Sequence, residues 1–317
     1  MAHQVESMMF VGATPWHGLG LNVQENISIT DAIIASGLDW EVEKVGLVTA
    51  DDHKPAKSAF GIRRVSDKRI LGTTGKSYRP LQNLEAFNFF QPYLDNKLCN
   101  LHTAGSLCEG EKVWVLANII ADPLEIVKGD MVEQFLMITN THDGKTAVQV
   151  GFTPIRVVCA NTLRMAQNSK NSKLIRVRHS MQVVQNIEAL RETMDLAKAE
   201  FEGTAEQYRV LAGKQIVTKD LEKYFRVVLD IDVDKARKDL PTRTQNRLDE
   251  MFKLFETGKG SDIEGVKGSL WGAYNAVTES LSWTASRNLN NRFDSLWFGT
   301  ADKINALALE TALAMAA

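Results

Sequence analysis

The sequence has few cysteines and no long apolar run. Three of its 317 residues are cysteine, Cys99, Cys108 and Cys159, and no two of them form a C-x-x-C pair. An odd number without paired spacing argues against a disulfide framework and against a cysteine-built zinc site. The start of the chain lacks a basic segment followed by an apolar one, and no window approaches the roughly 18 apolar residues of a membrane span. We therefore expect a cytoplasmic protein with no membrane contact.

Recognisable catalytic and metal-binding motifs are also missing. The six histidines include no H-E-x-x-H pattern and no pair at ligand spacing beside a carboxylate, so we expect no metal site. Only two residues separate Gly72 from Gly75, whereas a phosphate-binding loop has four between its glycines. We expect no cofactor and no enzymatic activity. An alternative is an enzyme of unrecognised chemistry that acts on nucleic acid, with Cys159, His142 and Asp143 as candidate residues.

Acidic residues are absent from one long stretch of a chain whose formal net charge is −2. Residues 144–187 contain seven Lys or Arg and no Asp or Glu, where ordinary composition would place about five acids. Residues 53–84 contain eight Lys or Arg and one acid, Asp67. Acid-poor basic stretches are typical of surfaces that attract phosphate. The two stretches therefore predict a nucleic-acid-binding face.

The first half of the chain reads as short strands with helices between them. Ser28 and Thr30 are candidate caps for a helix that ends at Gly37, and Asn83 is the candidate cap of a second helix. The predicted strands cover residues 40–48, 59–65, 69–73, 98–107, 112–120, 134–140, 146–159 and 174–179. The Asp-Gly pair at 143–144 predicts a hairpin turn. Pro154 is expected to bend its strand, because it cannot donate to a ladder.

From Met181 onwards the apolar residues recur at helical spacing. The predicted helices cover residues 181–201, 205–212, 219–229, 243–256, 270–286 and 301–316. Strands followed by helices predict an α+β fold, with an N-terminal antiparallel strand-rich half containing interspersed helices and a C-terminal helical half. We divide the chain into 1–180, a strand-rich basic domain and candidate nucleic-acid-binding region, and 181–317, a helical region for packing or oligomerisation. Trp271 and Tyr274 are predicted to lie in the helical core.

The strongest candidate site lies where the acid-free stretch passes from a strand into a predicted short helix. Asn161 is predicted to begin this helix, whose amides could hold a phosphate together with Arg156 and Arg164. The alternative is an ordinary bent strand followed by a helix cap. Phe152 could stack on a base, although such an aromatic more often belongs to the core. The candidate contacts are Arg63, Arg64, Lys68, Arg69, Lys76, Arg79, Lys145, Phe152, Arg156, Asn161, Arg164, Lys170, Lys173, Arg176 and Arg178.

Five ordered segments carry a family resemblance. They are TPWHGLG at 14–20, YRPLQNLEAF at 78–87, TAGSL at 103–107, TNTHDGKTAVQVGFTPIRVVCANTL at 139–163 and LWGAYNAVTE at 270–279. With these segments the chain resembles the phage/plasmid-like protein family, a domain of unknown function. The resemblance runs from about residue 1 to 316 and implies a mobile-element setting, but no activity and no functional residues. The strand order is also loosely similar to that of ring-forming single-strand annealing proteins, in which a small sheet and a helix line a basic groove.

These features predict a protein that binds single-stranded DNA without reading its sequence. By analogy with the annealing proteins, we expect a homo-oligomer, arranged as a ring, that acts in phage or plasmid recombination. The alternative is a protein-interaction module of a mobile element, for counter-defence or replication regulation, whose basic face meets an acidic protein. The acidic net charge and the few aromatics in the basic stretches favour that alternative.

Overall fold

The chain forms two compact units in a computed structural model that describes residues 5–12, 19–156, 161–162, 175–189, 194–284, 295–296 and 299–317. The strand-rich unit comprises Met1–Ala121, Phe135–Phe152 and Leu174–Leu196. The helical unit comprises Asp122–Gln134, Thr153–Lys173 and Ala197–Ala317. The units do not follow the division expected at residue 180, because two long strands, over 130–141 and 148–156, each begin in one unit and end in the other.

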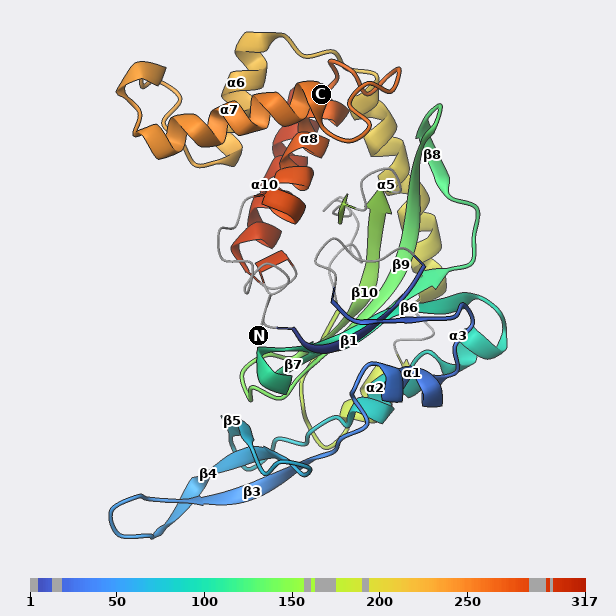
Figure 1. Ribbon diagram of the computed structural model, residues 1–317, viewed down its shortest axis with the longest axis vertical. Coiled ribbons are helices and arrows are strands. Elements are labelled where there is room, and N and C mark those ends of the chain that lie inside the picture. The colour runs from blue at the N-terminus through green and yellow to red at the C-terminus, as the bar shows by residue number, and fades with distance from the viewer. Residues whose placement is uncertain are drawn as a thin grey trace. The chain divides into compact units, whose positions relative to one another are not determined.

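The larger sheet contains nine strands among the described residues, in the order β11-β10-β9-β7-β6-β1-β2, with β12 paired to β10 and β8 to β9 (Figure 1). Its strands are β1 (Val5–Val11), β2 (Leu21–Val23), β6 (Cys99–Leu107), β7 (Lys112–Ile119), β8 (Leu124–Val127), β9 (Asp130–Thr141), β10 (Val148–Arg156), β11 (Asn161–Thr162) and β12 (Ile175–Val177). The predicted hairpin is confirmed, since β9 and β10 are neighbours, and β10 continues through Pro154. Sequence patterns missed β1, β2 and β8.

Helices α1 (Ile29–Ala35), α2 (Asn83–Asn88) and α3 (Gln91–Asp95) lie next to this sheet in the strand-rich unit (Figure 1). Ile29, Ala32 and Phe87 share a buried core with strand residues of β6, β7, β9 and β10. The predicted first helix is confirmed, with the Ser28 hydroxyl accepting from the Asp31 N–H at 3.1 Å. Gln82, rather than Asn83, is the N-cap of α2. The side-chain amide of Asn83 instead donates to the carbonyl of Leu38 at 3.1 Å.

The smaller sheet is the predicted meander of β3 (Val42–Val48), β4 (Pro55–Arg64) and β5 (Ile70–Thr74). Its strand β5 lies directly against the turn between β9 and β10. A Cβ atom on Gly72 would stand 2.5 Å from the Asp143 carbonyl oxygen, and one on Gly144 would stand 2.1 Å from the Thr73 carbonyl oxygen. Gly144 also has a positive φ of 75°, which glycine adopts readily. The close approach of the turn to β5 therefore depends on these two glycines.

The last helix of the strand-rich unit is α4 (Val183–Ala189), and the helical unit is built mainly from α5 (Met194–Ala212), α6 (Thr218–Val228), α7 (Thr242–Thr257), α8 (Leu270–Glu279) and α10 (Thr300–Ala316). Helix α8 is buried along its whole length, as predicted for Trp271 and Tyr274. The Trp271 ring stacks on Tyr208 at 4.7 Å, and its Nε1–H donates to the buried Asp130 carboxylate at 2.7 Å. No described helix is long and apolar enough to cross a membrane.

One predicted helix boundary was wrong. The sequence suggested a break between residues 201 and 205, but α5 runs without interruption through Gly203. Phe201, Ala205 and Tyr208 continue one buried face at helical spacing, and this packing outweighs the cost of about 1 kcal/mol for a glycine inside a helix. The observed order of elements confirms the α+β class.

Candidate nucleic-acid interface

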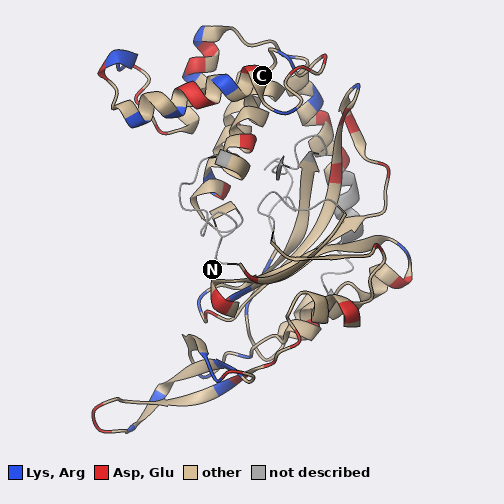
Figure 2. Ribbon diagram, in the orientation of Figure 1, with Lys and Arg blue, Asp and Glu red and all other residues tan. Residues whose placement is uncertain are grey.

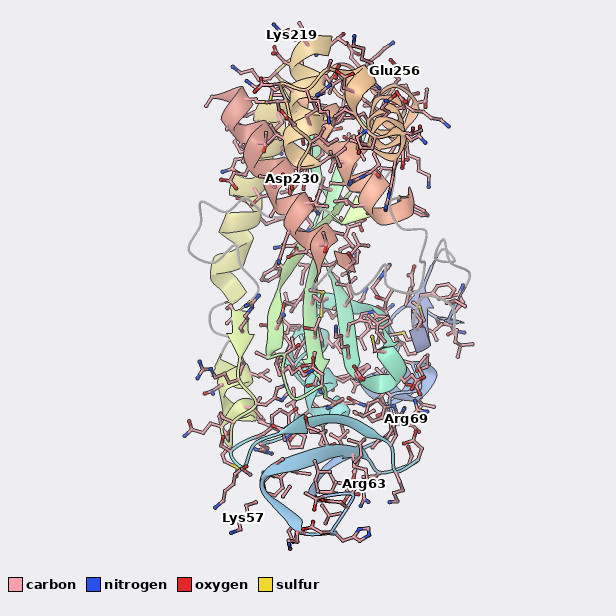
Figure 3. The ribbon with its side chains drawn as sticks, turned by 90° about the vertical axis from the view of Figure 1, so that its left-hand side faces the viewer. Lys57, Arg63, Arg69, Lys219, Asp230 and Glu256 are labelled. Carbon is pink, nitrogen blue, oxygen red and sulfur yellow. The ribbon has the colours of Figure 1, made fainter. Side chains whose placement is uncertain are left out.

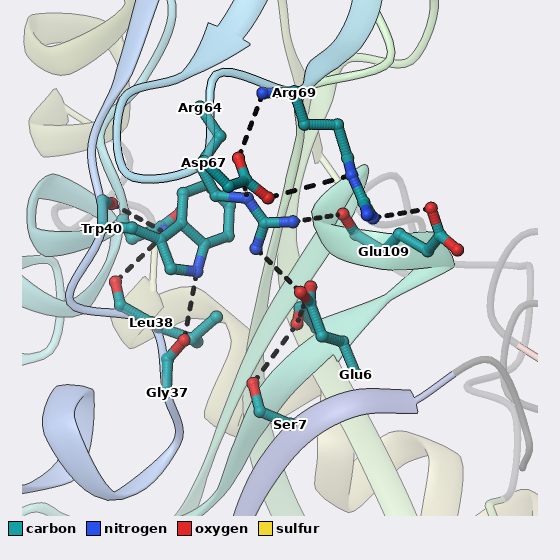
Figure 4. Close-up of polar contacts among 11 residues, drawn as sticks. Glu6, Ser7, Gly37, Leu38, Trp40, Arg64, Asp67, Arg69 and Glu109 are labelled. Carbon is teal, nitrogen blue, oxygen red and sulfur yellow. Dashed lines mark hydrogen bonds and ion pairs between the residues drawn. The ribbon is translucent and has the colours of Figure 1, made fainter. Parts of the chain in front are cut away.

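Arg64 is an internal ion-pair partner, with 4% of its surface exposed. Its Nη1 lies 2.9 Å from the Glu6 carboxylate and its Nε 3.3 Å from Asp67 (Figure 4). Its Nη2 donates to the Glu109 carbonyl at 2.8 Å, and the guanidinium lies 4.8 Å above the Trp40 ring. Arg64 therefore cannot contact a ligand at the surface, which corrects its predicted place in the interface.

Three further arginines predicted to bind nucleic acid are also held by carboxylates. Arg63 pairs with Glu43 at 2.8 Å, Arg69 with Glu109 at 2.6 Å, and Arg79 with Glu85 at 3.2 Å. Figure 3 shows Arg63 and Arg69 on the small sheet, together with the exposed Lys57. Glu6, Glu43 and Glu109 lie outside the window 53–84, so a count of charges within that window did not include them.

Four predicted contacts, Lys76, Lys145, Arg176 and Arg178, are exposed and have no ion pair with any described residue. We call these four residues the basic rim. They come from both acid-poor stretches. Figure 2 shows Lys and Arg in blue and Asp and Glu in red along the ribbon. Lys68 is exposed as well, but it lies in the turn that precedes β5, whereas Lys76 follows the other end of that strand.

The loop after β5 is fixed to the segment after β12, which brings the two stretches together. The Arg79 N–H donates to the His179 carbonyl at 3.1 Å, and the rings of Tyr78 and His179 stack with centroids 4.7 Å apart. The Tyr78 hydroxyl donates to the Thr141 carbonyl at 3.2 Å. The Lys44 ammonium donates to the carbonyls of Lys76 and Tyr78, at 2.7 and 3.0 Å, and so holds the loop to β3.

A pocket of about 300 Å³ lies within this arrangement. Its walls come from the loop after β5, from the β9–β10 turn and from the end of β12. They are formed by Thr74, Gly75, Ser77, Tyr78, Gly144, Lys145, Thr146, Ala147, Arg178 and His179. Arg178 and His179 both line the pocket, Arg178 with an exposed side chain and His179 with a buried one. Arg176 is also exposed.

Two buried histidines lie beneath the basic rim. His179 is 8% exposed and neither ring nitrogen makes a hydrogen bond. Burial lowers the pKa of His179 to about 4. The Arg79 backbone, which does not reach hydrogen-bond geometry, and the Asp143 carboxylate raise this pKa, but by less than burial lowers it. His142 is fully buried, and its Nε2 lies 3.1 Å from the Asn83 side-chain oxygen. Burial, with a smaller contribution from His179, lowers the pKa of His142 to about 3.

Two of the candidate enzyme residues, His142 and Asp143, are held in structural contacts. The Asp143 carboxylate accepts from the N–H groups of Lys145 and Thr146, both at 2.8 Å, and from the Thr146 hydroxyl at 2.7 Å. Burial raises the pKa of Asp143, but these hydrogen bonds outweigh burial and lower it below the ordinary value. With His142 inaccessible and Cys159 outside the described residues, these contacts favour a turn-stabilising role for Asp143.

The remaining predicted contacts do not join the basic rim. Phe152 is half-buried and packs against the core of the strand-rich unit. Asn161 does not begin a helix, because it lies in β11 and pairs with Arg156 of β10. The ladder formed by these two residues overrides the capping preference of Asn161. Arg164, Lys170 and Lys173 lie outside the described residues, as does the side chain of Arg156.

No group of three or more His, Cys, Asp or Glu side chains suited to a metal ion occurs in the described part of the chain. No curated protein and no solved structure matches the sequence. A family model described as "Domain of unknown function (DUF932)" matches residues 70–297. This range contains the small sheet's last strand, the pocket and most of both units. The chain therefore belongs to the DUF932 family.

Proposed function

We propose that this protein is a non-enzymatic, sequence-independent binder of single-stranded DNA, which contacts phosphates through the basic rim. The observation that carries the proposal is the contrast between the rim and the other arginines of the same unit. Arg63, Arg64 and Arg69 are neutralised by carboxylates, whereas Lys76, Lys145, Arg176 and Arg178 are exposed without an ion pair among the described residues. Cations that are not already paired are the ones available to displace counterions from a phosphate backbone.

The composition of the rim, and the pocket that Lys145 and Arg178 line, favour a flexible strand over a duplex. A duplex has a persistence length of about 50 nm, so it cannot bend sharply over a small concave surface, whereas a single strand can. The rim has no exposed aromatic side chain, because Tyr78 and Phe152 are packed inside the unit. Lys and Arg contacts to phosphates carry no base information, so binding is expected to be independent of sequence.

The resemblance to the phage/plasmid-like family supports a role of this binding in phage or plasmid recombination. Within this proposal the protein anneals complementary strands as a homo-oligomer. An annealing assay with complementary oligonucleotides tests this step separately from simple binding. Faster pairing than in protein-free controls, together with a large assembly on single-stranded DNA in mass photometry, is the expected result. Binding without faster pairing would reject the annealing step.

A salt titration with fluorescent oligo-dT of about 16 nucleotides tests the binding proposal. Four phosphate contacts predict that log K falls with log salt concentration at a slope of about −2.8, at about 0.7 per contact. The double variant Arg176→Glu and Arg178→Glu should bind much more weakly and with a slope of about −1.4, because two contacts are lost. Unchanged binding by this variant would refute the assignment of the rim.

Lys128 and Lys219 provide a matched control, because both are exposed cations of the helical unit without a described ion pair. Reversing them to Glu makes the same change in net charge as the rim variant. The proposal predicts that this control keeps the wild-type slope and loses little affinity. An equal loss in both variants would show that net charge, rather than the rim, governs binding.

The absence of an exposed aromatic from the rim also favours a second candidate, a protein-interaction module that meets an acidic partner. Competition between oligo-dT and a poly-glutamate peptide of equal charge distinguishes the two. If the peptide displaces the oligonucleotide at matched charge concentration, the rim recognises negative charge in general. If only nucleic acid competes, the DNA-binding proposal is favoured.

A further inference from the structure

The pocket at the basic rim contains a buried group that general strand binding does not require. His179 lines the pocket, is 8% exposed, and has no hydrogen-bond partner at either ring nitrogen. Buried polar side-chain atoms are nearly always paired, because an unpaired one loses its contacts with water without replacement. Because His179 lines the pocket, a ligand bound there can supply the missing partner.

The other polar groups of the pocket are predominantly donors. Lys145 and Arg178 supply positive charge, and the hydroxyls of Thr74 and Ser77 make no hydrogen bond with a described residue. The Asp143 carboxylate is not part of the wall, and it accepts hydrogen bonds from the backbone N–H of Lys145 and from the N–H and hydroxyl of Thr146. A wall with several free donors and two cations is complementary to an oxyanion.

We propose that this pocket binds one phosphate group, which accepts hydrogen bonds from His179 and from the hydroxyls and is neutralised by Lys145 and Arg178. A volume of about 300 Å³ exceeds that of a phosphate alone and is at the lower end of small-ligand sites, so an attached sugar also fits. This pocket would add a specific phosphate site to the proposed DNA-binding surface. The inference rests on the proposed function only in taking the phosphate to come from a DNA strand. That source is either the terminal phosphate of a strand or an internal phosphodiester.

Neutral His179 is sufficient for this role, because one of its ring nitrogens carries a proton in either tautomer. Its ring stays in place by stacking on Tyr78, whose hydroxyl is bonded to the Thr141 carbonyl. Arg178 is next to His179 in sequence, and Lys145 lies in the tight β9–β10 turn. The donors are thus positioned by ordered backbone segments before any ligand arrives, which reduces the entropy lost on binding.

The first test uses inorganic phosphate and the full chain. Titration should shift the imidazole NMR resonances of His179 but not those of His142, which is bonded to Asn83. His179→Phe should abolish saturable phosphate binding while keeping the ring stack on Tyr78. Its melting temperature should equal or exceed that of the wild type, because phenylalanine removes the unpaired nitrogens. His142→Phe should lower the melting temperature, because it removes the bond to Asn83.

The second test compares oligo-dT with a 5′-phosphate and with a 5′-hydroxyl. A terminal-phosphate site predicts about tenfold tighter binding of the phosphorylated strand, the equivalent of one charge-assisted hydrogen bond, and loss of this preference in His179→Phe. An internal site predicts equal binding of both strands and about tenfold weaker binding of both by the variant. Ser77→Ala, which removes an exposed hydroxyl of the pocket wall and no cation of the basic rim, should weaken phosphate binding if His179→Phe does not fold.

The outcomes separate this inference from the proposed function. If the oligonucleotide binds but phosphate leaves His179 unperturbed and both His179→Phe and Ser77→Ala bind DNA like the wild type, the phosphate pocket is refuted and DNA binding stands. If phosphate binds and shifts His179 but no oligonucleotide binds at about 50 mM salt, the DNA-binding proposal is refuted and the pocket stands.

Discussion

Replacing Arg64 by methionine should destabilise the strand-rich unit strongly. The guanidinium contacts Glu6 at 2.9 Å, Asp67 at 3.3 Å and the Glu109 carbonyl at 2.8 Å, while only 5% of the side chain is exposed. Removing one partner of a fully buried ion pair costs about 3–5 kcal/mol. The Glu6 and Asp67 side chains are 24% and 42% exposed, so water recovers part of this energy, and we expect a loss of about 2–4 kcal/mol.

The neighbouring residue supplies the control. Arg63 pairs with Glu43 through side chains that are 33% and 41% exposed, so Arg63→Met should cost only about 0.2–1 kcal/mol. Urea denaturation, combined with amide hydrogen exchange of β4, assigns the loss to the strand-rich unit, since a chain of two units need not unfold in one step. If Arg64→Met costs no more than Arg63→Met, the internal network does not hold this unit together.

Two further predictions concern the β9–β10 turn and the buried histidines. Gly144→Ala should lower the melting temperature far more than Gly129→Ala. Both glycines have a positive φ, but a Cβ on Gly144 would lie 2.1 Å from the Thr73 carbonyl oxygen, whereas one on Gly129 meets nothing within 4 Å. Equal losses in the two variants, each near the backbone cost of about 1–2 kcal/mol, would contradict the close approach of the turn to β5. Burial lowers the pKa of His142 to about 3 and of His179 to about 4, so both bind protons more readily when unfolded. The contribution of the two neutral rings to the free energy of unfolding is fully present above the unfolded pKa of about 6.5. It is lost as pH falls towards the folded pKa values, at up to about 1.4 kcal/mol per pH unit for each ring. Urea midpoints should therefore fall between about pH 6.5 and 5, and a flat profile would show that both rings reach solvent.

Local patterns predicted most of the secondary structure. The meander of β3 to β5, the β9–β10 hairpin and the helices of the C-terminal half follow from alternation, helical spacing and the Asp-Gly turn. The parallel pairing of β1 with β2 was not predicted, because a strand of three residues such as Leu21–Val23 is too short to show alternation. Asn161 was misassigned because a capping preference is weaker than the pairing of β11 with β10.

The candidate site was predicted only in outline. Counting charges in 53–84 and 144–187 identified the four residues of the basic rim. The count did not distinguish them from Arg64 and the other arginines that form ion pairs. His179 was absent from the predicted contacts, since no motif distinguishes a buried histidine without a hydrogen-bond partner from an ordinary core residue. The stacked pair Tyr78 and His179, and the pocket around it, join residues about a hundred positions apart.

The sequence by itself determined the α+β class and the concentration of positive charge in two stretches, because periodicity and composition are properties of neighbouring residues. Tertiary structure alone decided which cations remain exposed and that both stretches contribute to one pocket. Ion pairing and burial depend on distances in space, and Coulomb energy changes steeply with distance and surroundings. Glu6 and Glu109 therefore neutralise arginines of the small sheet from outside the basic stretch, while Lys145 and Arg178 face the same pocket without a carboxylate partner among the described residues.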